Sequence, residues 1–74
     1  MINNRDPLVL KEFGNNLRKL RKERGFSQEK LSLQAGISKN QIGNIERGEV
    51  NITLGTLAVL AKTFNISLKE LFDY

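Results

Sequence analysis

The chain has 74 residues, with 12 Lys or Arg against 8 Asp or Glu and a formal net charge of +4. This length predicts a single domain over residues 1–74, with a small core. The absence of Cys and His excludes disulfides and metal sites built on those side chains, and it favours the cytoplasm over secretion. No apolar run approaches membrane-spanning length, and the N-terminus lacks the pattern of a signal peptide.

Positive charge is concentrated in the first two thirds of the chain. Residues 1–48 carry ten Lys or Arg against five Asp or Glu, whereas residues 49–74 carry two against three. A basic segment is typical of a protein that binds a polyanion, although solvated basic helices are also common. Charge alone is therefore consistent with two hypotheses: that the basic segment binds nucleic acid, or that it forms a solvated surface.

The sequence predicts five helices, and the first two lie before residue 36. The first spans about residues 7–24, because Asp6-Pro7 forms a helix start, apolar residues recur at helical spacing and Gly25 ends the run. Ser27 caps a second helix that ends near Ala35. Residues 1–5 lack apolar periodicity and are expected to form a loose arm.

Three shorter helices follow, each opened by a hydroxyl residue. Ser38 caps the third, which ends at Arg47; Thr53 caps the fourth, and Ser67 opens the fifth. The fourth and fifth helices are expected to supply the second half of the core, through Leu57, Leu60, Ala61, Phe64, Leu68 and Leu71. The short connections indicate an all-α, compact five-helix bundle.

The second and third helices are separated only by residues 36–38, a turn too tight for antiparallel packing. They should therefore cross steeply as a helix-turn-helix over about residues 27–47, with Leu31, Ala35, Ile37, Ile42 and Ile45 filling the angle between them. Helix-turn-helix proteins place the second helix in the DNA major groove. Amide and basic side chains there read base edges, and this helix carries Lys39, Asn40, Gln41 and Asn44.

The run NLRKLRKERGFSQEKLSLQAGISKNQIGNIERG resembles the phage-repressor and xenobiotic-response-element (XRE) family, and TLGTLAVLAKTFNISLKELF resembles the remainder of its five-helix, lambda repressor-like domain. The ERG and NIT segments are also similar to restriction-modification controller proteins, which are small single-domain dimers. The resemblance implies a transcriptional regulator that binds double-stranded DNA at a palindromic operator as a homodimer, without a cofactor. Gly43 departs from the family pattern, and we expect a tight helix–helix contact there, with close approach to DNA as the alternative.

The resemblance also implies roles for individual residues. Arg21 and Glu46 would form a partly buried ion pair, with the Arg21 guanidinium close to a phosphate; the alternative is two solvated side chains. Gln28 would hydrogen-bond a phosphate from the start of its helix, unless it only faces solvent. Lys39, Asn40, Gln41 and Asn44 would read bases, since amides pair with adenine and Lys with guanine. Further phosphate contacts are assigned to Arg18, Ser38, Arg47 and Asn51, and Arg5 would reach DNA only if the arm is ordered.

Other function classes are less well supported by the residues. Without His, Cys or a Gly-rich phosphate loop, no catalytic arrangement can be assembled, so we do not expect an enzyme. No small-molecule ligand and no membrane partner is indicated. The main alternative is an antitoxin that binds a toxin protein and regulates its own operon, although such proteins usually carry an added toxin-binding segment.

Apolar residues outside the expected core suggest a dimer interface. Ile52, Val59, Phe72 and Tyr74 fall off the apolar stripe of the last two helices, in the part of the chain with almost no net charge. Small domains seldom expose such a group without a use for it. We therefore expect a homodimer through these residues, which would place two recognition helices about 34 Å apart along DNA.

Overall fold

The computed structural model describes residues 6–74; the predicted arm, with Arg5, lies outside them. Five helices follow one another: α1 (Pro7–Glu23), α2 (Gln28–Ala35), α3 (Lys39–Glu46), α4 (Leu54–Thr63) and α5 (Leu68–Leu71). No strand occurs between residues 6 and 74. The prediction of an all-α five-helix bundle is confirmed, and the helices end within a residue or two of the predicted positions.

Each helix begins at a side-chain cap. Asp6 Oδ1 accepts from the backbone N–H of Leu8 at 3.0 Å, and the hydroxyls of Ser27, Ser38, Thr53 and Ser67 each accept from the backbone N–H three residues later. These bonds satisfy N–H groups that have no partner within the helix. The predicted starts therefore coincide with the caps.

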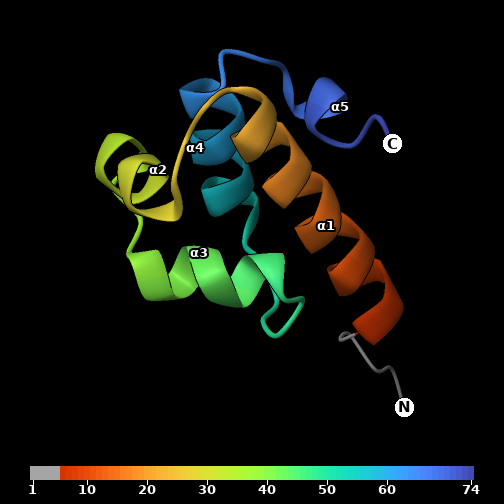
Figure 1. Cartoon of the computed structure of the whole chain (residues 1–74). Helices are drawn as coiled ribbons and strands as arrows, with labels where there is room; N and C mark the ends of the chain where they lie inside the picture. The colour runs from red at the N-terminus through yellow and green to blue at the C-terminus, as the bar shows by residue number, and fades with distance from the viewer. Residues whose placement is uncertain (1–5) are drawn as a thin grey trace.

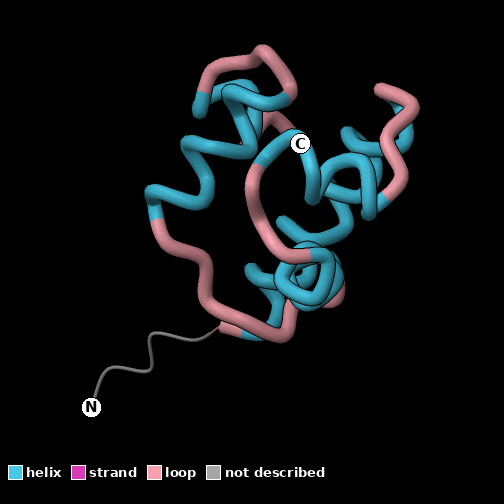
Figure 2. The backbone as a smooth tube through the Cα atoms, turned by 90° about the vertical axis from the view of Figure 1, so that its left-hand side faces the viewer, coloured by secondary structure: helices cyan, strands magenta, loops and turns pink. Residues whose placement is uncertain are grey.

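The helices are arranged so that α3 is held from two sides. In Figure 1, α1 runs along one side of the molecule, α2 lies across from it, and α3 lies along the lower edge. α3 packs against both α1 and α2, whereas α4 contacts α2 and α5. Figure 2 shows the same bundle turned by 90°, with the longest connection, residues 47–53, joining α3 to α4.

One core unites the helices. Nine apolar side chains are buried in it: Phe13, Leu17, Leu31, Ile42, Ile45, Leu60, Ala61, Phe64 and Leu71. Two expectations about the second half of the chain are wrong. Leu68 is exposed, because it is the first residue of the short α5, whereas Ile52 is half-buried and packs against the core.

Two residues of α1 that the sequence did not mark fix the packing. Gly14 is buried where α1 crosses α3, and a Cβ built on it would press on the carbonyl oxygens of Ile45 and Glu46. Asn16 is also buried, and its Nδ2 donates to the carbonyl oxygen of Leu71 at 2.9 Å. α1 therefore approaches α3 closely on one face and is tied to the end of α5 on another.

Candidate nucleic-acid interface

The turn between α2 and α3 is short because Gly36 adopts a left-handed conformation. Its φ is +69°, a region that residues with a Cβ rarely adopt. The backbone N–H groups of Gly36 and Ile37 both donate to the carbonyl oxygen of Ser32, at 3.0 and 3.3 Å. The chain then restarts as α3 at the Ser38 cap, and the two helices cross steeply (Figure 1).

Buried side chains fix the angle between α2 and α3. Leu31, Ile42 and Ile45 are at most 1% exposed, and the half-buried Ala35 and Ile37 pack against them. Ile42 and Ile45 occupy the inner face of α3, so the opposite face is turned outward. The orientation of α3 is therefore set by its buried side chains and not by its outward-facing polar groups.

The outward face of α3 carries most of the residues expected to read bases. Lys39, Asn40 and Gln41 are exposed, and they lie together in the first turn of the helix. Asn44 lies one turn further on and is half-buried. Its Oδ1 accepts from Arg47 Nη2 at 2.6 Å. Three of the four predicted side chains therefore face solvent, and the fourth is already engaged within the protein.

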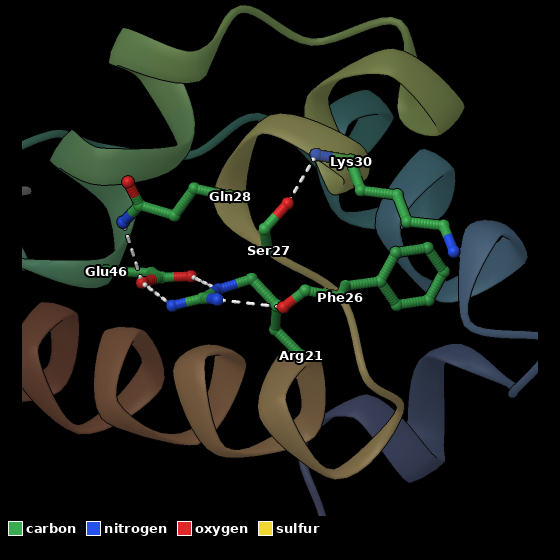
Figure 3. Close-up of polar contacts among 6 residues, drawn as sticks. All are labelled: Arg21, Phe26, Ser27, Gln28, Lys30 and Glu46. Carbon is green, nitrogen blue, oxygen red and sulfur yellow. Dashed lines mark hydrogen bonds and ion pairs between the residues drawn. The ribbon is translucent and has the colours of Figure 1, made fainter.

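Behind α3, an ion pair joins the end of the helix to α1. Arg21 Nε donates to Glu46 Oε2 at 2.6 Å and Nη2 donates to Oε1 at 3.1 Å, with side-chain exposures of only 9% and 4%. Figure 3 shows two further partners: Arg21 Nη1 donates to the carbonyl oxygen of Phe26 at 2.9 Å, and Gln28 Nε2 donates to Glu46 Oε1 at 3.0 Å. α1, the start of α2 and the end of α3 thus meet in one hydrogen-bonded cluster.

This cluster uses donor groups of Arg21 and Gln28, two residues that the sequence assigns to phosphate contacts. Arg21 is buried and three of its N–H groups have protein partners, so it does not present a free guanidinium to a phosphate. Gln28 is half-buried and gives one N–H to Glu46, which leaves its second N–H available. Sequence reasoning paired Arg21 with Glu46 through the family pattern but did not anticipate the part that Gln28 takes.

The other predicted phosphate contacts lie around α3. Ser38 Oγ accepts from the backbone N–H of Gln41 at 3.1 Å, which leaves its hydroxyl proton free to donate. Arg18 and Asn51 are exposed, on α1 and on the α3–α4 connection. Arg47 is exposed too, but its guanidinium is held by Asn44 and, at 3.1 Å from Nε, by Glu49 Oε1.

The expectation for Gly43 is wrong. The nearest atom to a Cβ built on Gly43 is Arg47 Nη1 at 3.0 Å, a side chain of the same helix region and not a neighbouring helix. The close helix–helix contact lies instead at Gly14 on α1, where the carbonyl oxygens at the end of α3 approach. Gly43 therefore leaves space for the Arg47 guanidinium to fold back over α3.

Two of the four residues expected at a dimer interface line one hollow, and the other two do not. Ile52 and Phe72 line the same apolar hollow of about 360 Å³, and the Phe72 ring lies 5.4 Å from that of Phe13, centroid to centroid. Tyr74 instead lines a separate hollow with residues of α1, where burial raises the pKa of its hydroxyl. Val59 is partly exposed on α4 and lines neither hollow.

Residues 6–74 contain no group of three or more acidic side chains that could hold a metal ion. None of the helices between these limits is both long and apolar enough to cross a bilayer.

Comparison with known proteins identifies relatives that match most of the chain. Control protein C.SmaI of Serratia marcescens is 43% identical over 56 residues, covering 76% of this chain and 67% of that protein. The crystal structure of the restriction-modification controller protein C.AhdI from Aeromonas hydrophila superposes with a TM-score of 0.85 at 38% identity, covering 88% of this chain and 98% of that one. The C.Esp1396I controller tetramer, solved in complex with its natural 35 base-pair operator, matches with a TM-score of 0.82 at 26% identity, over 92% of this chain and 90% of that one.

A family model described as Helix-turn-helix (HTH_3) matches residues 17–71, from the middle of α1 to the end of α5. The matched segment includes the α2–α3 turn, the exposed face of α3 and the Arg21–Glu46 cluster. The resemblance stated from the sequence is therefore confirmed, and the chain belongs to the helix-turn-helix family, in which it is similar to restriction-modification controller proteins.

Proposed function

We propose that this chain is a transcriptional regulator that binds double-stranded DNA sequence-specifically, with the first turn of α3 in the major groove. The observation that carries the proposal is the exposure of Lys39, Asn40 and Gln41 on a helix whose opposite face is locked into the core. These side chains supply the donors and acceptors that distinguish base pairs in the major groove. A helix held rigidly by the core places them without a large loss of backbone freedom on binding.

The relatives support this reading. C.SmaI and C.AhdI are named as controller proteins, and C.Esp1396I was solved on its operator. The antitoxin alternative draws no support from these relatives, and we do not propose it. A regulator of this kind needs no catalytic group, cofactor or small-molecule ligand. It acts in the cytoplasm, where the DNA is.

Phosphate contacts are assigned to groups that have a free donor and surround α3. Ser38 keeps its hydroxyl proton and Gln28 keeps its second side-chain N–H as free donors. Both residues lie at the start of a helix, where the helix dipole also favours an anion. Arg18 lies on α1 between Gly14, which touches α3, and Arg21, which is paired with it, so its exposed guanidinium is at the rim of the α1–α3 contact. Asn51 is exposed beyond the end of α3. Arg21 itself acts in the scaffold.

Selection of bound sequences from a random duplex library with purified protein tests the proposal. Asn40→Ala should lose about 1–3 kcal/mol on the selected duplex and little on random DNA, since a base contact carries the discrimination. Asn15→Ala is the matched control, because Asn15 is also an exposed amide but lies on α1, in the hollow that Tyr74 lines, and not on α3. Failure to enrich any sequence, or equal losses for Asn40→Ala on all duplexes, would contradict the proposal.

We also assign the protein a homodimeric state on a palindromic operator. One α3 reads only a few base pairs, whereas a two-fold dimer presents two such helices on one face of the duplex. Val59 and Phe72 are apolar, partly exposed and outside the α3 face. They are the residues through which a second copy would pack.

Sedimentation equilibrium at micromolar concentration tests this assignment. Val59→Asp should shift the protein towards monomer, because a charge in an apolar interface is desolvated without a partner. Leu33→Asp on α2 is the control, since Leu33 is an equally apolar but more exposed residue outside α4 and α5. A wild type that stays monomeric and binds one half-site as tightly as the full palindrome would refute the dimer.

A further inference from the structure

The Arg47 side chain is 57% exposed, but its guanidinium lies folded back against α3. Gly43 has no side chain, and the space that its Cβ would occupy is 3.0 Å from Arg47 Nη1. A larger residue at position 43 would push the guanidinium away. The glycine in the middle of α3 thus makes room for an arginine one turn later.

Two acceptors hold Arg47 in this position. Nη2 donates to Asn44 Oδ1 at 2.6 Å and Nε donates to Glu49 Oε1 at 3.1 Å. Glu49 is itself anchored, because its backbone N–H donates to the carbonyl oxygen of Asn44 at 2.9 Å. Arg47 therefore bridges the last turn of α3 and the chain that follows it.

The bridge fixes which end of the Asn44 amide is free. A guanidinium has only donors, so the amide atom that faces it must be the oxygen. The Asn44 Nδ2 group, with two N–H donors, then lies on the other side of the amide. The positive charge beside Oδ1 also disfavours a further donor there, such as the amino group of adenine.

We propose that Arg47 is a positioning residue that turns Asn44 into a hydrogen-bond donor, so that this side chain reads guanine. This inference rests on the proposed function and deepens it. Guanine presents two acceptors, N7 and O6, in the major groove, whereas adenine presents an acceptor and a donor. It also replaces the sequence-based expectation that Asn44 pairs with adenine and that Arg47 only holds a phosphate.

Duplex selection with three variants tests the inference. The wild type should show a guanine preference at one position that Asn44→Ala makes indifferent, with a loss of roughly 5- to 150-fold in discrimination. Arg47→Met keeps the aliphatic stem but removes every donor, so it should let adenine compete at that same position and leave the other positions unchanged. Arg18→Met is the matched control, because Arg18 is an exposed arginine of α1 that makes no hydrogen bond to α3. It should lower affinity on all sequences and reduce the salt slope by about one unit, without changing base preference.

The outcomes distinguish failure of the proposed function from failure of the inference about Asn44 and Arg47. A wild type that enriches no sequence overturns the proposed function and the inference together. A wild type that enriches a sequence overturns the inference alone in two cases: if Asn44→Ala changes no position, or if Arg47→Met lowers affinity everywhere with preferences intact. The hydrogen bond from Arg47 to Asn44 can also be observed without DNA. The NMR signals of the Asn44 side-chain amide protons should shift in Arg47→Met and not in Arg18→Met. Unshifted Asn44 amide signals in Arg47→Met would overturn the inference as well.

Discussion

Removal of the Glu46 carboxylate should be among the most damaging single changes in this chain. Glu46→Ala takes away two of the three acceptors of the Arg21 guanidinium, leaving only the Phe26 carbonyl, and it also removes the acceptor of Gln28. The ion-paired side chains in this site are only 9% and 4% exposed. A buried cation left without its partner costs roughly 3–5 kcal/mol. A domain of this size has only about 4–11 kcal/mol of stability in total. At roughly 2.1 cal/mol/K of unfolding entropy per residue, the melting temperature should fall by about 20–30 °C.

The assay is thermal and urea unfolding followed by circular dichroism, with a matched control in the same chain. Glu49 pairs with Arg47 at 3.1 Å, but the two side chains are 57% and 56% exposed. Glu49→Ala should therefore cost at most about 1 kcal/mol, because water screens an exposed pair. A second comparison uses the double variant Arg21→Met with Glu46→Leu, which removes both charges and should recover most of the loss.

If Glu46→Ala has the same melting temperature as the wild type, the buried pair does not stabilise the fold. If Glu49→Ala is as damaging as Glu46→Ala, burial is not the cause of the effect. A double variant as unstable as Glu46→Ala would show that the shape and hydrogen bonds of the pair, rather than the stranded charge, carry the loss.

The helices could be predicted because their signals are local. Asp6, Ser27, Ser38, Thr53 and Ser67 cap helices through bonds to residues two or three positions away, which a sequence pattern contains directly. Apolar spacing marked most of the core for the same reason. Leu68 was misassigned to the core because periodicity does not show that the short α5 leaves its first residue at the surface.

The contacts that fix the site could not be predicted in this way. Asn16 bonds the Leu71 carbonyl 55 positions away, and Gly14 matters only because the backbone of α3 approaches it. The Arg21–Glu46 pair spans 25 positions and came from the family pattern, since no local rule links the two. Arg47 and Asn44 are near in sequence, but which of their atoms meet depends on side-chain conformations that Gly43 and Glu49 decide.

Two further predictions test the packing of α1 and the cap of α5. Gly14→Ala should destabilise the protein by about 1–3 kcal/mol in urea unfolding, because its Cβ meets backbone oxygens. A Cβ on Gly55 meets only the Thr53 hydroxyl, at an ordinary 3.8 Å, so Gly55→Ala should stabilise the protein by about 0.5–1 kcal/mol. Equal effects of the two changes would contradict the close α1–α3 contact. At α5, the Ser67 backbone N–H donates to Glu70 Oε1 at 3.1 Å and, with the Ser67 hydroxyl, lowers the pKa of Glu70. A carboxylate with a lowered pKa contributes stability that is present above its unfolded pKa and lost as pH falls through the folded one. Glu70→Gln keeps an acceptor but does not titrate, so between about pH 6 and pH 3 the wild type should lose more stability than this variant. Thermal unfolding of both proteins across that range measures the difference, and parallel losses would show that the charge of Glu70 does not support the cap.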